Sequence, residues 1–263
     1  MENKHTVLGI VTARGGSKGI LHKNLYPIAG MPLMYYCITN AQNSGIFDRI
    51  ILSTDDPKIA DVGKNFGVEV PFMRPAHLAE DKTPTFDVIE HALGAIKEQY
   101  DYVGIIQPTA PVIQGFHWQE AYEVLLEKEA DSVISVLEVP MKFHPSKAIM
   151  ETEEGTYKVP WARRAGLGRQ QLPRVYYSTA GIYLFKTSNI KGGDFYGNKF
   201  VPYAIDDEQY ALDVNDLEDL EKARDSIMMF DTPEDRIKDI EAYQKLCEEY
   251  KNQSSTVHFG SLS

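Results

Sequence analysis

A cationic, glycine-rich loop near the start of the chain is the stretch best suited to chemistry. The apolar run from Val7 to Thr12 is followed by Arg14, Gly15, Gly16, Ser17, Lys18, Gly19, Lys23 and Asn24. Glycines let the backbone turn its N–H groups inward, and the arginine and lysines supply charge for an anion. A buried strand leading into such a loop is typical of phosphate sites at the carboxyl edge of a parallel sheet. The loop therefore predicts a polyphosphate site, with a solvated turn as the alternative.

The spacing of the glycines separates this loop from two common nucleotide motifs. Gly15, Gly16 and Gly19 lack the dinucleotide spacing, and no Gly-Lys-Ser/Thr closes a Walker loop. A nicotinamide oxidoreductase is therefore disfavoured. The sequence also contains no Gly-x-Ser-x-Gly elbow, which leaves hydrolase chemistry of that kind without a nucleophile.

A second polar loop follows another apolar run. Residues 102–106 lead directly into Gln107-Pro108-Thr109-Ala110-Pro111. Prolines stiffen such a loop, and the Gln107 amide donates and accepts hydrogen bonds at once. The pattern indicates a ligand-facing loop at the sheet edge, or alternatively a simple entry into the next helix.

The elements that must position these loops alternate along the chain. Apolar, β-branched runs predict strands at 7–12, 49–53, 68–71, 102–106 and 132–137. Periodic patterns predict helices at 33–41, from the cap at 54–57 to about Phe66, at 85–100 and at 115–129. This alternation predicts an α/β fold of three layers around a mostly parallel sheet.

The alternation fails between residues 139 and 179, which divides the chain. Aromatic residues there, including Tyr157, Trp161 and Tyr176, are too apolar for a solvated tether, so the segment is interpreted as an inserted lobe. The core then comprises 1–138 and 180–230, with strands at 181–185 and 199–203 and a helix at 215–229. Residues 231–263 form a C-terminal unit, with a helix at 232–251 and a polar tail.

The composition limits the kinds of partner that the protein is expected to bind. The 263 residues carry a net charge of −11, which argues against nucleic acid or an anionic membrane as a partner. No stretch is long and apolar enough to span a bilayer and no signal region precedes the first strand, so a cytoplasmic location is expected. Cys37 and Cys247 lie in helical patterns and are expected to be ordinary core or surface residues.

Four motifs together resemble the acylneuraminate cytidylyltransferases, the CMP-sialic acid synthetases. They are residues 13–19 with Lys23-Asn24, residues 47–55, Arg74-Pro75-Ala76-His77-Leu78-Ala79, and residues 107–111. The resemblance covers about Val7 to Leu220. It implies a Rossmann-like nucleotidyltransferase fold and a reaction in which CTP and an acidic nine-carbon keto sugar give the CMP-sugar and pyrophosphate.

The resemblance also assigns roles to residues. It implies that Arg14, Gly15, Ser17, Lys23 and Asn24 hold the triphosphate and ribose, and that Arg74 and Thr85 line the cytidine side. Gln107 would face the acidic sugar. Lys23, Arg14 and Asp213 would be the catalytic groups, with Lys23 at the charge that develops in the transition state.

A metal site is implied as well, with a departure from the family pattern. Mg²⁺ is the expected cofactor because it bridges phosphate oxygens. The family carries two aspartates two residues apart; Asp213 matches the first, whereas the second is Asn215. As an alternative, Asn215 and Glu218 have the spacing of a helix capping box. The acids at 206–208 are reserve ligands, although such runs are usually solvated surface.

The inserted lobe matches the dimerisation segment of the family. This implies a homodimer in which Arg169 of the lobe meets the substrate of the neighbouring subunit, with plain surface ion pairing as the alternative. Beyond it, the family arginine and asparagine are replaced around Tyr177 and Thr179, which are expected to bind the substrate. The exchange favours a legionaminic, pseudaminic or other nonulosonic acid over sialic acid. Alternatives are a cytidylyltransferase for a phosphonate or shorter ulosonate, and a CTP-binding sensor.

Overall fold

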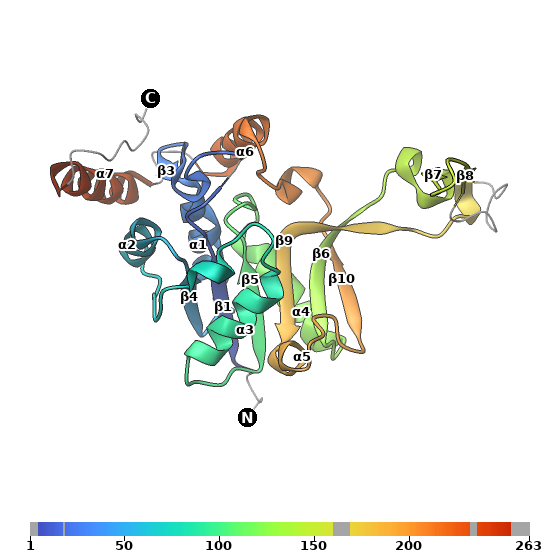
Figure 1. Ribbon diagram of the computed structural model, residues 1–263, viewed down its shortest axis with the longest axis horizontal. Coiled ribbons are helices and arrows are strands. Elements are labelled where there is room, and N and C mark those ends of the chain that lie inside the picture. The colour runs from blue at the N-terminus through green and yellow to red at the C-terminus, as the bar shows by residue number, and fades with distance from the viewer. Residues whose placement is uncertain (1–4, 18, 160–168, 232–235, 254–263) are drawn as a thin grey trace.

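A six-stranded mixed sheet forms the centre of the protein (Figure 1). The computed structural model describes residues 5–17, 19–159, 169–231 and 236–253. The strands, in the spatial order β10-β6-β9-β5-β1-β4, are β10 (Phe200–Ala204), β6 (Ser132–Glu138), β9 (Tyr176–Lys186), β5 (Tyr102–Ile106), β1 (Val7–Thr12) and β4 (Arg49–Ser53). β9 runs antiparallel to β5 and β6, whereas the other neighbouring pairs are parallel. The expectation of a mostly parallel sheet is confirmed.

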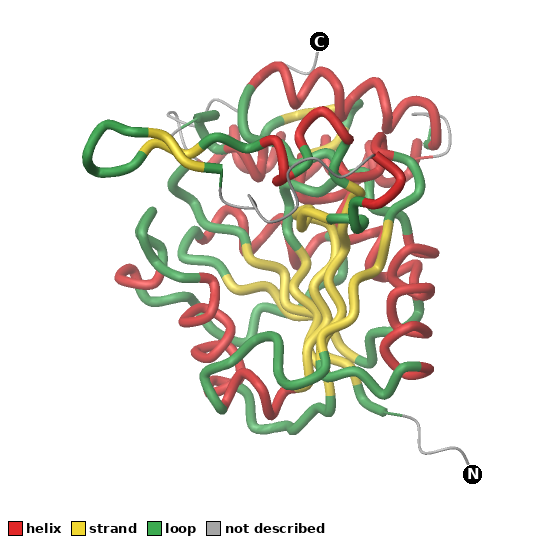
Figure 2. The backbone as a smooth tube through the Cα atoms, turned by 90° about the vertical axis from the view of Figure 1, so that its right-hand side faces the viewer, coloured by secondary structure: helices red, strands yellow, loops and turns green. Residues whose placement is uncertain are grey.

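Helices cover both faces of this sheet (Figure 2). The helices are α1 (Leu33–Ser44), α2 (Pro57–Asn65), α3 (Thr85–Ala95), α4 (Gly115–Glu127), α5 (Thr187–Lys191), α6 (Leu217–Phe230) and α7 (Ile237–Gln253). Alternate residues of β1 point to opposite faces. Val7 and Val11 pack in the larger core cluster with α1 and α4, and Leu8 and Ile10 pack in the smaller one with α3 and α5. Three layers therefore form around β1, as predicted.

An arm extends from the core beyond β6 and β9 (Figure 1). It carries the short hairpin of β7 (Met150–Glu151) and β8 (Tyr157–Lys158) and the single-turn 3₁₀ helices Met141–Phe143, Pro145–Lys147 and η6 (Arg169–Gln171). The insertion predicted at 139–179 corresponds to this arm. However, β9 begins at Tyr176, so one continuous strand crosses the predicted boundary and joins the arm to the sheet.

Four local predictions need correction. Residues 68–71 form an isolated bridge between Ile51 and Glu69 instead of a strand. Helix α3 ends at Ala95, although its apolar stripe continues to Tyr100. Helix α6 begins at Leu217 with Asp216 as N-cap, because Asp216 and Asp219 form a capping box one residue beyond the predicted pair. Finally, the small hairpin of β2 (Pro27–Ile28) and β3 (Met31–Pro32) and helix α5 were not anticipated.

The C-terminal helix α7 packs against the core. Its Tyr243 and Cys247 are buried, as is Cys37 of α1, so that of the two expected places, core or surface, both cysteines lie in the core. The predicted tail falls partly in α7, which ends at Gln253, and otherwise lies outside the described residues. Within the described part of the chain, no helix has the length and hydropathy needed to cross a membrane.

Candidate active site

The site lies where the chain order of the sheet reverses. From β1 the chain first moves to β4 on one side and later to β5 on the other. Loops that leave the carboxyl ends of these three strands diverge here, and ligands of open α/β sheets bind at such switch points. A pocket of about 280 Å³ opens at this place. Its polar lining includes Arg14, Ser17, Lys23, Asn24, Arg74, Glu80, Asp81, Thr83, Thr85, Gln107 and Thr109.

The glycine-rich loop is held in shape by hydrogen bonds at both ends. The Gly15 N–H donates to Asp55 Oδ1 at 2.9 Å, and Asn24 Nδ2 donates to the Arg14 carbonyl at 2.9 Å. A Cβ at Gly15 would lie 2.8 Å from Asp56 Oδ2, so the close approach of the two loops requires glycine. At Gly16, in contrast, a Cβ would meet nothing within 4 Å. Gly16 lines the pocket and leaves room for a ligand to approach the backbone.

Lys23 connects the loops that form the pocket. Its Nζ donates to the Val214 carbonyl at 2.8 Å, and the Val214 N–H donates to the Thr109 carbonyl at 2.8 Å. Segments that follow β1, β5 and β10 are therefore joined at one point. Burial lowers the pKa of Lys23, Asp213 opposes this shift and Arg14 adds to it. A desolvated ammonium beside a carboxylate is well placed to exchange its carbonyl contact for an incoming anion.

Arg74 contributes a second, more deeply buried cation. Its side chain is 6% exposed, and its Nε and Nη2 donate to Ser53 Oγ and the Ser53 carbonyl at 3.1 and 2.6 Å. Burial lowers the pKa of Arg74 to about 10, with Asp55 opposing and Arg14 adding to the shift. The guanidinium is thus bound to the end of β4 by neutral groups while it lines the pocket. Such a charge favours an anionic ligand beside it.

Arg14 is engaged by a carboxylate. Its Nη2 lies 2.8 Å from Asp81 Oδ1, and both side chains are about one-third exposed. Asp81 belongs to the segment between the 3₁₀ helix Ala76–Leu78 and α3. Because both residues line the pocket, the ion pair brings this segment to the glycine-rich loop.

Three further predicted site residues are found in the same pocket. Ser17 lies in the loop, Thr85 begins α3 and Gln107 follows β5, and all three line the cavity. Six residues predicted to bind the nucleotide are therefore brought together, namely Arg14, Ser17, Lys23, Asn24, Arg74 and Thr85. Gln107, predicted to face the acidic sugar, lines the same pocket, and Gly15 links the loop backbone to Asp55. Lys18 lies outside the described residues.

Asp213 and Asn215 lie beside Lys23, next to the pocket lining. Asn215 Nδ2 donates to Asp213 Oδ2 and to the Asp213 carbonyl, each at 3.1 Å. A Cβ at Gly19 would lie 2.8 Å from the Asn215 carbonyl, so the segment of Asp213 and Asn215 contacts the glycine-rich loop directly. The carboxylate of Asp213 is an oxygen donor that suits Mg²⁺, which commonly uses one or two carboxylates together with substrate phosphates. In the described ranges, no group of three or more His, Cys, Asp or Glu residues forms a potential metal cluster.

Three of the four residues predicted to bind the acceptor lie on elements apart from this pocket. Thr179 is buried, and its hydroxyl lies 2.6 Å from Ser135 Oγ on β6. Tyr177 is exposed and pairs with Leu137 at the base of the arm. Arg169 begins η6, whose Gln170 lines a cavity of about 630 Å³ between η6 and the segment after β6. One chain therefore does not bring these three positions to the nucleotide pocket.

Two acidic residues of the site were missed from the sequence as functional groups. The sequence predicts Asp55 in a helix cap. Its position two residues after β4, as Arg14 stands two residues after β1, is the signal that could place it at the sheet edge. Asp81 lies in a segment without periodicity, and only the folded structure brings it to Arg14.

The fold and the site define an α/β protein with a cationic, glycine-rich pocket at the switch point of its sheet. Over residues 8–249 the sequence matches the family model described as Cytidylyltransferase, and the chain belongs to this family. It is 30% identical over 221 residues to a protein of Campylobacter jejuni named pseudaminic acid cytidylyltransferase, covering 82% of this chain and 94% of that one. It is 31% identical over 214 residues to the CMP-N,N'-diacetyllegionaminic acid synthase of the same organism, covering 80% and 89%.

A solved structure supports the same fold. The structure of CMP:2-keto-3-deoxy-manno-octonic acid synthetase complexed with CTP superposes with a TM-score of 0.63 at 15% identity. The superposition covers 85% of this chain and 99% of that one. This neighbour confirms the nucleotidyltransferase fold predicted from the sequence.

Proposed function

We propose that the protein transfers CMP from CTP to the anomeric hydroxyl of an acidic nonulosonate sugar and releases pyrophosphate. The observation that carries this proposal is the pocket at the switch point in a member of the cytidylyltransferase family, which is lined by Arg14 and Lys23 of the glycine-rich loop and by Arg74. Three cations meet the charge of a triphosphate within a chain whose net charge is −11.

The reaction requires the anomeric oxygen to attack the α-phosphorus while the bond to the bridging oxygen breaks. The hydroxyl proton is lost, and pyrophosphate leaves with the electron pair of the broken bond. Such a step depends on alignment and on stabilising the charge that develops on the phosphoryl oxygens. In this proposal Lys23 and Arg14 bind these oxygens, and the exposed backbone at Gly16 receives the phosphate chain. Arg74 and Thr85 bind the nucleoside end, and Gln107 faces the acceptor.

Mg²⁺ is the proposed cofactor. Asp213 would hold it, with Asn215 as a neutral neighbour, and phosphate oxygens would complete its coordination. When bound, the ion would neutralise charge on the phosphates. Asp213 lies close enough to Lys23 to oppose the lowering of its pKa, so the carboxylate belongs to the same electrostatic site.

The acceptor is proposed to be an acid of the pseudaminic or legionaminic type. Relatives about 30% identical carry these names. At the positions where sialic acid enzymes present an arginine and an asparagine, this chain has Tyr177 and Thr179. The hydroxyl of Thr179 is engaged by Ser135, so Thr179 differs from an asparagine that faces a sugar. An exposed tyrosine at 177 offers an apolar face instead.

A homodimer in the cytoplasm is part of the proposal. The arm carries exposed apolar side chains, with Phe143 68%, Ile149 71% and Tyr157 68% exposed. Apolar side chains gathered on a projecting arm are typical of a surface that a partner covers. A second copy would bring Arg169 of one arm toward the pocket of the other, where an arginine could bind the acceptor carboxylate.

The proposal is tested with CTP, Mg²⁺ and a panel of acids, with pyrophosphate release as the readout. The panel contains pseudaminic, legionaminic and sialic acids, an eight-carbon ulosonate and a phosphonate. Rapid release with a nonulosonate, together with a CMP-sugar of the expected mass, supports the proposal. Release with the shorter ulosonate or phosphonate alone would favour the alternative acceptor. Binding of CTP without product from any acid would favour a sensor.

A further inference from the structure

The hairpin that follows Lys23 is closely coupled to it through the backbone. Lys23–Leu25 form a 3₁₀ turn that leads within two residues into the β2–β3 hairpin. The Tyr26 N–H donates to the Lys23 carbonyl at 3.0 Å, and the Leu33 N–H donates to the Tyr26 carbonyl at 2.9 Å. A displacement of the hairpin therefore moves the backbone of Lys23.

The turn of this hairpin has a conformation that needs external support. Its central residues Ala29 and Gly30 have φ values of 45° and 87°. A positive φ is costly for alanine, so neighbouring contacts must stabilise the turn. Tyr36 of α1 supplies them: its buried hydroxyl donates to the Ile28 carbonyl at 2.6 Å, with the Ala29 carbonyl at 3.2 Å.

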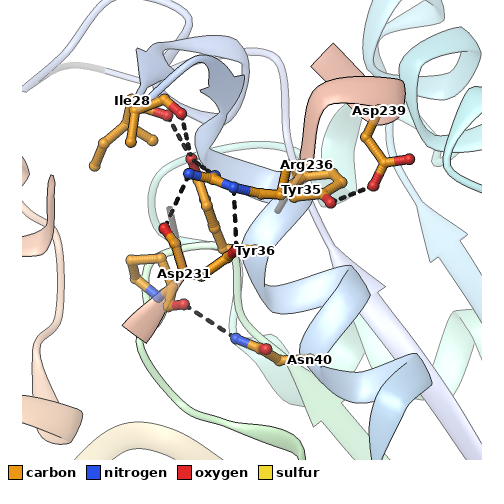
Figure 3. A network of polar contacts seen from close by, with 9 residues as sticks. Ile28, Tyr35, Tyr36, Asn40, Asp231, Arg236 and Asp239 are labelled. Carbon is orange, nitrogen blue, oxygen red and sulfur yellow. Dashed lines mark hydrogen bonds and ion pairs between the residues drawn. The ribbon is translucent and has the colours of Figure 1, made fainter. Parts of the chain in front are cut away.

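Arg236, just before α7, fixes this hydroxyl from the other side (Figure 3). Its Nη1 donates to Tyr36 Oη at 2.5 Å, and the guanidinium lies over the Tyr36 ring at 5.1 Å from the centroid. Nη2 donates to the Asp231 carbonyl and Nε lies 3.1 Å from Asp231 Oδ2. Arg236 is 4% exposed, so its charge is buried with its partners already in place.

Helix α7 reaches the hairpin by a second, apolar contact. A Cβ at Gly30 would lie 3.2 Å from Ile240 Cδ1, so this side chain packs directly on the turn. The adjacent Tyr35 of α1 also bonds to α7, because its hydroxyl donates to Asp239 Oδ2 at 2.5 Å. Both tyrosine hydroxyls thus bond to the C-terminal segment, and the hydroxyl of Tyr36 also contacts the hairpin carbonyls (Figure 3).

We propose that Tyr36 and Arg236 are positioning residues for the transfer reaction, which support the Ala29–Gly30 turn and thereby hold Lys23 at the phosphate loop. This inference rests on the proposed function of Lys23. It gives the C-terminal helix a role in catalysis although its residues lie outside the pocket lining. The helix supports the hairpin through Ile240, which packs on the turn.

The test compares Tyr36→Phe with Tyr35→Phe. Each variant removes one hydroxyl that bonds to the C-terminal segment and keeps the ring, so each is expected to weaken the docking of α7 to a similar extent. Hydrogen–deuterium exchange of residues 23–32 is measured on the free proteins, well below their melting temperatures. Tyr36→Phe is expected to raise exchange about fivefold, the factor that one buried hydrogen bond contributes, and Tyr35→Phe to leave this peptide unchanged.

Turnover provides the second measurement. Tyr36→Phe is expected to lower kcat on the order of tenfold with the KM for the acceptor unchanged, because misplacing a catalytic group raises the barrier of the chemical step. Tyr35→Phe is expected to retain kcat. Equal exchange in the two variants would show that Tyr36 does not support the hairpin. Raised exchange in Tyr36→Phe with an unchanged kcat would show that this support has no role in catalysis. If exchange rises in Tyr36→Phe alone and the wild type is inactive on the whole acid panel, Tyr36 supports the hairpin but the proposed function is refuted.

Discussion

Arg14 Nη2 and Asp81 Oδ1 form an ion pair of 2.8 Å within the proposed triphosphate site. A triphosphate that binds Arg14 must compete with this carboxylate. The pair therefore joins the segment before α3 to the phosphate loop in the free protein, and nucleotide binding exchanges one anion for another.

Replacing Asp81 by asparagine is expected to tighten CTP binding about threefold, because a partly exposed ion pair of this kind contributes a fraction of a kcal/mol. Calorimetry without acceptor measures the effect, which should shrink as salt is added. Glu127→Gln, which removes the exposed partner of Lys128 on α4, serves as control. Weaker binding in Asp81→Asn would show that the carboxylate supports the nucleotide site instead of competing for it.

Asn215→Asp is expected to lower the Mg²⁺ concentration needed for half-maximal turnover. The substitution places a second carboxylate beside Asp213, where an amide now donates a hydrogen bond. Two carboxylates attract a divalent cation more strongly than one. Asn65→Asp at the exposed end of α2 is the matched control. An unchanged Mg²⁺ concentration for half-maximal turnover would indicate that Asn215 only stabilises the loop before α6 and does not take part in metal binding.

The arm is expected to carry the contact between two copies. Ile149→Glu places a charge on its exposed apolar surface and should shift the protein from dimer to monomer in sedimentation velocity. Met229→Glu, at a 72% exposed position on α6, should leave the assembly unchanged. A wild type that sediments as a monomer would remove the proposed place of Arg169 in the neighbouring pocket.

The pH dependence of turnover follows from Lys23. Burial lowers its pKa below the ordinary value for lysine, so turnover should fall as the pH rises through this lowered pKa and the ammonium loses its charge. Between the folded and unfolded pKa values the unfolded chain binds more protons, so Lys23 makes folding more favourable as the pH rises. Deprotonation of Lys23 therefore does not unfold the protein at alkaline pH, so unfolding caused by this group does not explain a loss of activity there. In Lys23→Arg the alkaline limb should move to higher pH; an unmoved limb would assign it to another group.

The central fold could be predicted because local patterns determine it. Val7–Thr12 and Tyr102–Ile106 are apolar runs that end in polar loops, and both strands have the predicted bounds. The direction of β9 could not be read in the same way, because an apolar run that fits a buried strand is equally compatible with either orientation. Its orientation follows from the arm, which returns the chain to the sheet at the end where β6 leaves it, so that the start of β9 pairs with the end of β6.

The grouping of residues at the switch-point pocket could be predicted in large part, whereas the surroundings of Tyr177 and Thr179 could not. The carboxyl ends of β1 and β5 meet at one edge of the sheet. Because Arg14, Lys23 and Gln107 lie in the loops that follow these strands, their positions along the chain indicated their positions in space. Thr179 shows the limit of this reasoning. Its hydroxyl is buried against Ser135, a partner 44 residues away that depends on the register of two antiparallel strands. The support of the hairpin by Arg236 likewise depends on how α7 docks.

Single-turnover transfer by Lys23→Ala tests the central claim most directly. Enzyme in excess over CTP is mixed with Mg²⁺ and the best acid of the panel, and formation of the CMP-sugar is followed. Removing the ammonium is expected to slow the step about 10²- to 10³-fold, since it loses a partner of the charge that develops in the transition state. The melting temperature should remain close to that of the wild type. A folded Lys23→Ala enzyme that forms product at nearly the wild-type rate would contradict the account.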